Sequence, residues 1–189
     1  PTIRHDYCAA GAAAVIDVAR RVLPRHGVAT VDTGAHRILL NQMWECYGPR
    51  QLLQSTGLGT MGIALPLAIG HKLAKPDLPV IAFTGDAGLE MVMGELATVR
   101  DLGIAFPIVV FVDRSLALIE LKQRDRKLDN LGVDFGGTDF PALAEAMGGT
   151  GVLVDSRDGL TAALEAALAS DKFSIIACDI GYQPYEGRF

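Results

Sequence analysis

Aromatic residues, cysteines and basic residues are all scarce in this sequence, and each shortage excludes a class of protein. Only 6% of the 189 residues are aromatic although half are apolar, so the chain has enough aliphatic surface for a core and is not a disordered tail. Three cysteines (Cys8, Cys46 and Cys178) are too few for a disulfide scaffold and form no CxxC pair, so we expect reduced thiols. The 17 basic against 22 acidic residues argue against a nucleic-acid partner.

Long hydrophobic runs are also missing. The best apolar run, residues 104–112, has the length of a strand, whereas a membrane helix needs roughly 20 residues. The first residues contain no apolar segment of a secretory signal, and they lack an initiator Met, so the chain is either processed or part of a longer protein. We expect a cytoplasmic protein without a membrane partner, folded as a single domain over residues 1–189.

Continuous apolar runs alternate with segments of helical periodicity along the chain. Such runs are typical of strands that are buried on both faces of a parallel sheet. The order predicts an α/β fold: an open, doubly wound, mostly parallel six-stranded sheet with helices on both faces. We expect strands at residues 28–31, 80–84, 108–112, 151–154 and 174–178, with a weak short strand at 52–55. We expect helices at residues 9–23, 35–44, 62–74, 89–102, 116–127, 139–147 and 158–169.

Ligands of such sheets bind beyond the carboxyl ends of the strands. The turns to inspect are therefore residues 32–34, 55–61, 85–88 and 113–116. The stretch 57–62 matches the pattern G-x-G-x-x-G, and Asp86 follows it by 24 residues at the end of a strand. A dinucleotide-binding domain of an NAD-type dehydrogenase is one hypothesis, although the preceding strand is poor.

The second glycine turn, residues 85–88, places Asp86 directly after a strand and before a helix. Backbone N–H groups of such a turn can bind phosphate oxygens, but a carboxylate beside them repels phosphate unless a divalent cation lies between. Magnesium prefers one or two carboxylates together with substrate phosphates. Asp113 ends the next apolar strand, so the two carboxylates are expected at neighbouring strand ends.

Several motifs in this order resemble the diphosphate-binding (PP) domain of thiamine diphosphate (ThDP, or thiamine pyrophosphate, TPP) enzymes, especially acetolactate synthase-like decarboxylases and carboligases. The motifs are Asp32-Thr33-Gly34-Ala35-His36, Gly57-Leu58-Gly59-Thr60-Met61-Gly62, Gly85-Asp86-Ala87-Gly88 and Val112-Asp113-Arg114-Ser115-Leu116. The resemblance covers nearly the whole chain.

The resemblance implies two cofactors, ThDP and Mg²⁺, and a role for each motif. Asp86, Asp113 and the carbonyl of Ser115 would bind the metal. The amides of Ala87 and Gly88, in the cofactor-binding turn with Gly85 and Asp86, would contact the diphosphate together with Thr33, Gly34, Ala35 and His36. The backbone of Gly59 and Met61 would hydrogen-bond the aminopyrimidine edge, with the Met61 side chain supporting the bent shape of the cofactor. Leu116 is a further expected cofactor contact.

Two departures from the family pattern bear on function. Val112-Asp113 stands where the family has an Asn-Asn pair, which adds negative charge beside a diphosphate. The Glu that activates the cofactor belongs to a separate pyrimidine-binding domain, which this chain does not contain, so no catalytic residue is assigned within it.

The expected partner is therefore a pyrimidine-binding domain or subunit, in a homo- or hetero-oligomer. The expected reaction is decarboxylation of a 2-oxo acid, or transfer of its acyl group to a second carbonyl. A non-catalytic ThDP-binding module remains an alternative. Outside these motifs, Glu90 could approach a substrate pocket, Trp44 is expected to pack in the core, and the charged run 120–127 is expected to be a solvated helix face.

Overall fold

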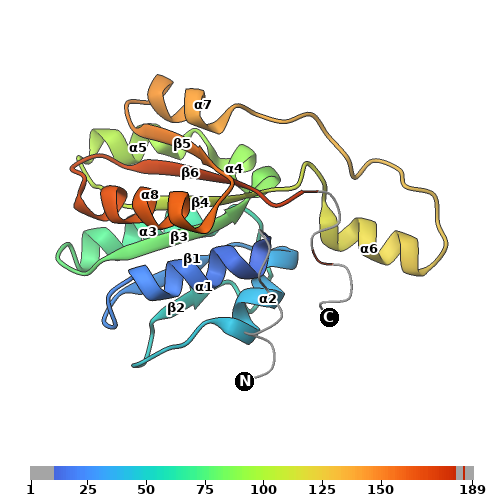
Figure 1. Cartoon of the computed structure of the whole chain (residues 1–189), viewed down its shortest axis with the longest axis horizontal. Coiled ribbons are helices and arrows are strands. Elements are labelled where there is room, and N and C mark those ends of the chain that lie inside the picture. The colour runs from blue at the N-terminus through green and yellow to red at the C-terminus, as the bar shows by residue number, and fades with distance from the viewer. Residues whose placement is uncertain (1–10, 182–184, 186–189) are drawn as a thin grey trace.

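The structure is a computed structural model that describes residues 11–181 and Tyr185 (Figure 1). Cys8 and the first residues of the predicted helix 9–23 lie outside the described part. The remaining cysteines, Cys46 and Cys178, are free thiols, the first exposed and the second buried.

A six-stranded sheet forms the centre of the molecule, and all of its strand pairs are parallel. This confirms the doubly wound α/β prediction and sharpens it from mostly to entirely parallel. The strand order is β2 (Leu52–Gln54), β1 (Val28–Val31), β3 (Val80–Gly85), β4 (Pro107–Val112), β6 (Ser174–Asp179) and β5 (Thr150–Val154). Because the strands are parallel, their carboxyl ends lie along one edge of the sheet.

Helices cover both faces of the sheet (Figure 1). One face packs against α1 (Ala12–Val22), α2 (Ala35–Met43) and α8 (Arg157–Ala169). The other packs against α3 (Ala64–Ala74), α4 (Asp86–Val92), α5 (Glu95–Asp101) and α7 (Phe140–Ala146). A further helix, α6 (Ala117–Asp125), stands away from the sheet beyond the end of β4.

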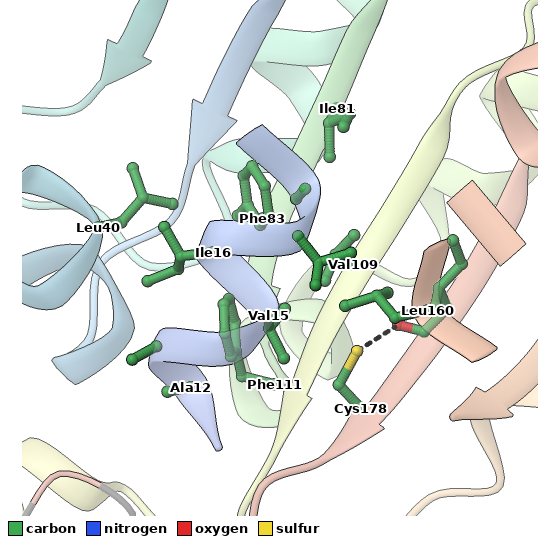
Figure 2. Packing of buried hydrophobic residues seen from close by; sticks show 14 of the residues in the cluster. Ala12, Val15, Ile16, Leu40, Ile81, Phe83, Val109, Phe111, Leu160 and Cys178 are labelled. Carbon is green, nitrogen blue, oxygen red and sulfur yellow. Dashed lines mark hydrogen bonds between the residues drawn. The ribbon is translucent and has the colours of Figure 1, made fainter. Parts of the chain in front are cut away.

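The two core clusters follow the alternation of side chains along each strand. In β4, Val109 and Phe111 belong to the first cluster, whereas Ile108 and Val110 belong to the second. Figure 2 shows Val15 of α1 among the first cluster. Trp44 is also buried there, edge-on to Phe83, which confirms its predicted packing role.

Several local predictions need correction. The short strand expected at residues 52–55 is not among them, because it is present over Leu52–Gln54 and pairs with β1. The predicted helix 89–102 is two helices, because the chain breaks at Met93–Gly94, and the first of them begins as early as Asp86. Strand β5 is not buried on both faces, since Leu153 is 62% exposed at the sheet edge.

The charged run 120–127 was predicted as a solvated face, and this is wrong for its first residue. Glu120 is buried, and it receives hydrogen bonds from the Arg124 guanidinium, with Nε at 3.1 Å from Oε1. Its neutralisation by an arginine one helical turn away is what makes this burial tolerable. Across the described ranges, none of the helices is both long and apolar enough to cross a bilayer.

Candidate functional site

A cavity of about 240 Å³ opens at the carboxyl ends of β1, β3 and β4. Every residue that the sequence singled out for ligand contact lines it. These residues are Thr33, Gly34, Ala35, His36, Gly59, Met61, Gly85, Asp86, Ala87, Gly88, Asp113, Ser115 and Leu116. The parallel sheet therefore brings four separate stretches of sequence to one place.

Five further residues line the cavity that sequence reasoning missed: Phe111, Ala117, Leu118, Ile119 and Tyr185. Residues 117–119 begin α6 directly after Leu116. Their closeness in sequence to this predicted contact was the signal that could have identified them. The sequence pattern around Phe111 is that of an ordinary strand, and nothing in the sequence marks Tyr185, which lies far beyond Leu116 in the chain.

Asp86 and Asp113 face each other across two strand ends. Asp86 begins α4, and its carboxylate accepts hydrogen bonds from the amides of Ala87 (2.8 Å), Asp113 (3.1 Å) and Arg114 (2.7 Å). These bonds tie the loop after β4 to the turn after β3. Asp113 in turn accepts a hydrogen bond from the amide of Ser115 at 3.2 Å.

Both carboxyl groups have raised pKa values, and the charge of Asp86 contributes to the shift at Asp113. Burial raises the pKa of Asp86 above its usual range, against the opposing effect of its amide donors. Burial and the charge of Asp86 raise the pKa of Asp113 to about 7. Two neighbouring carboxyl groups with raised pKa values form a site that a cation would stabilise.

Arg114 shapes the loop between these groups. Its backbone has φ of 57°, a left-handed conformation that is uncommon for a residue with a side chain. Its guanidinium reaches away from the cavity and pairs with Asp179 at the end of β6, at 3.0 Å. The ion pair and the hydrogen bond from its amide to Asp86 together hold the turn that presents Asp113 and Ser115.

Basic side chains take no part in this lining. Among the described residues around the cavity there is neither lysine nor arginine. An anionic ligand would therefore be held by backbone N–H groups, neutral side chains and a metal ion, because the described lining offers it no lysine or arginine.

Buried polar atoms around the cavity lack partners. Thr33 Oγ1, His36 Nε2 and Ser115 Oγ are buried and have no hydrogen-bond partner within the described part of the chain. Such atoms are rare in folded proteins unless a ligand, ion or water satisfies them. Their convergence on one cavity fits a polar ligand.

His36 is a neutral imidazole in this environment. Burial lowers its pKa to about 4, although the nearby Asp32 acts in the opposite direction. The ring stacks on Phe111, with 5.3 Å between centroids and 17° between planes. It can therefore offer Nε2 to a ligand as a donor or an acceptor without adding a charge.

The glycine pattern at 57–62 forms part of this same cavity. Gly59 has φ of 61° and Gly62 has φ of 80°, so both take a left-handed turn that favours glycine. Gly59 and Met61 line the cavity together with the acidic pair, whereas Gly57 does not line it. Glu90 also stays outside the lining, and its carboxylate accepts a hydrogen bond from the Thr138 hydroxyl.

Comparisons with known proteins agree with this geometry. Residues 32–178 match the family model described as "Thiamine pyrophosphate enzyme, C-terminal TPP binding domain". An acetolactate synthase of Bacillus subtilis (strain 168) is 31% identical over 168 residues, which cover 89% of this chain and 30% of that protein. A probable acetolactate synthase large subunit of Methanococcus aeolicus is 35% identical over 150 residues, covering 78% of this chain and 25% of that protein.

The fold has a close counterpart among solved structures. The ThDP-dependent 4-hydroxybenzoylformate decarboxylase of Rhodococcus jostii RHA1 superposes with a TM-score of 0.85 at 22% identity, over 92% of this chain and 33% of that one. This chain thus spans about a third or less of the length of these proteins. The match over residues 32–178 shows that the chain belongs to the family of C-terminal TPP-binding domains of thiamine pyrophosphate enzymes.

Proposed function

We propose that the chain binds ThDP together with Mg²⁺ in this cavity and serves as the diphosphate-binding part of a 2-oxo acid decarboxylase or an acetolactate synthase-like carboligase. The observation that carries the proposal is the charge arrangement of the cavity. Two carboxyl groups and several unsatisfied neutral polar atoms surround a space with no lysine or arginine in its described lining. Such a site suits a diphosphate only when a divalent cation accompanies it.

In this proposal the metal is held by the carboxylates of Asp86 and Asp113 and by the backbone carbonyl of Ser115. All three supply oxygen, the ligand atom that magnesium prefers, and the diphosphate would complete the shell. Asp113 fits in place of the family's amide because a carboxylate oxygen is an equally competent ligand.

The diphosphate would lie between the turn after β3 and the start of α2. The amides of Ala87 and Gly88 belong to the first, and the unpartnered Thr33 hydroxyl and His36 Nε2 to the second. A neutral His36 would contact this part of the ligand through Nε2 without adding a charge. These contacts orient the ligand, and the metal balances its charge.

The remaining wall of the cavity would hold the pyrimidine side of the cofactor. Gly59 contributes backbone polar groups without a side chain, and Met61 and Leu116 contribute apolar surface. When bound, ThDP supplies the carbon nucleophile that attacks the keto carbon of a 2-oxo acid and takes up the electron pair left by CO₂. The chain's own work is to hold the cofactor in one conformation and keep water from its reactive face.

A pyrimidine-binding domain, in the same or another subunit, would complete the site with the activating Glu. Three apolar side chains near the cavity support a partner surface there: Leu58 is 94% exposed, Met91 65% and Ile119 48%. Exposed apolar groups gathered near a site are typical of an interface. The 2-oxo acid would bind between the two domains.

The experiment that tests the ligand is titration calorimetry of the chain with ThDP in Mg²⁺, with ThDP in EDTA, and with NAD⁺ or NADH. We expect binding of ThDP in Mg²⁺ and a large loss of affinity in EDTA. Tight binding of NAD(H) without a metal requirement would overturn the proposal in favour of the dinucleotide hypothesis.

The activity is tested separately, with pyruvate as the 2-oxo acid and CO₂ release as the measurement. The chain alone is expected to be inactive and to gain activity with a pyrimidine-domain partner that carries the Glu. Turnover by the chain alone would contradict the assignment of activation to a partner. Binding of ThDP without turnover in any assembly would favour the non-catalytic module.

A further inference from the structure

Asp32 is a fully buried carboxylate that does not line the cavity but lies directly behind it. It follows the last residue of β1, and it accepts four hydrogen bonds. The amides of Thr33 (2.8 Å) and Ile63 (3.1 Å) donate to Oδ1, and the amide of Gly62 (2.9 Å) and the hydroxyl of Thr84 (3.0 Å) donate to Oδ2. A carboxylate has the acceptor capacity for all four donors at once.

These donors come from three different walls of the cavity. Thr33 opens the turn before α2. Gly62 and Ile63 end the loop that carries Gly59 and Met61. Thr84 immediately precedes the turn that begins at Gly85. One side chain therefore connects the proposed pyrimidine-side loop to both proposed diphosphate-side turns.

The backbone of the metal turn also passes directly beside Asp32. A Cβ atom built on Gly88 would lie 2.1 Å from Asp32 Oδ2 and 2.9 Å from Thr84 Oγ1. Only a glycine leaves room for this carboxylate between β1 and α4. The close approach fixes the distance between the two sides of the cavity.

We propose that Asp32 is a positioning residue that sets the Gly59–Met61 loop against the Asp86 turn, so that one cofactor can meet both at once. The inference rests on the proposed function for its consequence in ThDP binding. The geometry on which it stands, four hydrogen bonds from three separate segments of the chain, is independent of any ligand.

Replacement by asparagine is a sharp probe because an amide cannot reproduce this pattern. An NH₂ group at the Oδ1 position would face two backbone N–H groups, neither of which can reverse. At the Oδ2 position it would face the Thr84 hydroxyl, which can turn to accept, and the amide of Gly62, which cannot. Asp32→Asn therefore leaves the Gly62 amide without an acceptor.

The first test is amide hydrogen exchange of the full chain without cofactor, resolved by NMR. In the wild-type chain, we expect the Gly62 and Ile63 amides to be protected about 100-fold or more relative to that of exposed Leu58. In Asp32→Asn, the Gly62 amide should exchange at least about tenfold faster, while β3 and β4 keep their protection. Wild-type exchange of Gly62 and Ile63 as fast as Leu58 would overturn the proposal without any variant.

Thr30→Val is the matched control. The buried Thr30 hydroxyl donates to the carbonyl of Ala64 at 2.8 Å, so it also ties β1 to the start of α3, but not through Asp32. It should leave the Gly62 and Ile63 exchange rates nearly unchanged. Equal acceleration in Thr30→Val and Asp32→Asn would overturn the specific role of Asp32.

The second test separates positioning from general stability. Binding of ThDP and of inorganic pyrophosphate, both with Mg²⁺, is compared by calorimetry. Pyrophosphate needs only the metal side, whereas ThDP needs both sides, so Asp32→Asn should lower the affinity for ThDP about tenfold more than that for pyrophosphate. A loss of the same factor for both ligands would overturn the proposal.

Thr84→Val covers the case in which Asp32→Asn does not fold. It removes one of the four donors and keeps the shape of the side chain, so the fold should survive. We expect about two- to threefold faster Gly62 exchange and a fall in the ratio of ThDP to pyrophosphate affinity of similar size; no change in either would count against the proposal. If the wild-type chain bound no ThDP, the proposed function would fail while the exchange results still decided the structural role of Asp32.

Discussion

The helices that begin at the cavity differ from α7 and α8, which begin elsewhere, in whether a side chain accepts hydrogen bonds from the N–H groups of the first turn. α2, α4 and α6 follow Gly34, Gly85 and Leu116, and none of these residues provides a side-chain cap. α7 and α8 are capped in the ordinary way. The carboxylate of Asp139 accepts a hydrogen bond from the amide of Ala142 at 3.0 Å, and the hydroxyl of Ser156 accepts one from the amide of Gly159 at 3.3 Å.

The starts of α1, α3 and α5 also lack a side-chain cap, so it is position at the cavity that makes the uncapped starts of α2, α4 and α6 available to a ligand. The first N–H groups of any helix lack backbone partners, and a cap normally satisfies one of them. At α7 and α8 the sequence supplies that cap, so those ends serve the fold. At the cavity the cap position holds glycine or Leu116, neither of which caps the first N–H groups. The Ala87 amide is already used by Asp86, and the N–H groups that lack an acceptor are open to an anion.

Among substitutions that test this contrast between helix starts, Asp86→Ala is expected to have the largest effect on ligand affinity. Removing this carboxylate takes away a proposed metal ligand, so the affinity for ThDP in Mg²⁺ should fall by roughly 100-fold or more. Calorimetry at fixed Mg²⁺ measures it. Asp101→Ala, which removes an exposed acid on α5, is the control and should bind as the wild type does. Equal affinities of the Asp86 and Asp101 variants would contradict the assigned role.

The sequence predicted the edge of the sheet where this site lies because the topology left few alternatives. Residues 80–83 and 108–112 are apolar at every position, which requires cover on both faces and hence a parallel sheet. Parallel strands then bring Asp86 and Asp113 to one edge. These inferences depend on local pattern and connectivity alone.

The misses depend on packing between distant segments. Leu153 is apolar like its neighbours, but it lies on an edge strand, which no local pattern reveals. Glu120 is charged, but an arginine one turn away allows its burial. Tyr185 reaches the cavity from the far end of the chain, beyond any spacing rule.

Gly88→Ala tests the close approach of α4 to Asp32 behind the cavity through a steric clash and leaves the charge unchanged. The new methyl group would lie about 2.1 Å from Asp32 Oδ2, so we expect a loss of about 1–3 kcal/mol in the free energy of unfolding. Gly94→Ala is the matched control. Gly94 has helical φ and ψ and open space around its Cα, so alanine there should stabilise the chain by about 0.5–1 kcal/mol. Urea unfolding measures both, and equal effects of the two variants would contradict the close approach.

Asp113→Asn tests the electrostatic part of the cavity. The pKa of Asp113 is raised to about 7 from 3.8, so the folded chain holds a proton that the unfolded chain releases. The contribution of Asp113 to the free energy of unfolding is therefore fully present below about pH 4 and is lost as the pH rises through 7. The asparagine of the variant does not titrate. In EDTA, the free energy of unfolding of the variant should therefore exceed that of the wild type by roughly 1–3 kcal/mol at pH 8 and equal it at pH 4.

Urea unfolding across this pH range is the measurement, and parallel pH profiles of the two proteins would contradict the prediction. Metal binding should show the complementary behaviour. Below about pH 7, Mg²⁺ has to displace a proton from wild-type Asp113, so its affinity should fall with decreasing pH more steeply than in Asp113→Asn.

The smallest effects sharpen the comparison most, because they are opposite at the two kinds of helix start. The Thr33 hydroxyl is buried at the cavity without a partner in the described chain, so Thr33→Val removes an unsatisfied group at constant shape. We expect unchanged or slightly higher stability and an affinity for ThDP lowered severalfold, about 1 kcal/mol. Ser156→Ala removes a working cap, so it should lower stability by about 1 kcal/mol and leave ThDP affinity unchanged. Urea unfolding gives the stability of both variants, and calorimetry gives their affinity for ThDP. A loss of stability in Thr33→Val with unchanged affinity for ThDP would mean that the unpartnered polar atoms at the cavity stabilise the fold and do not bind the ligand.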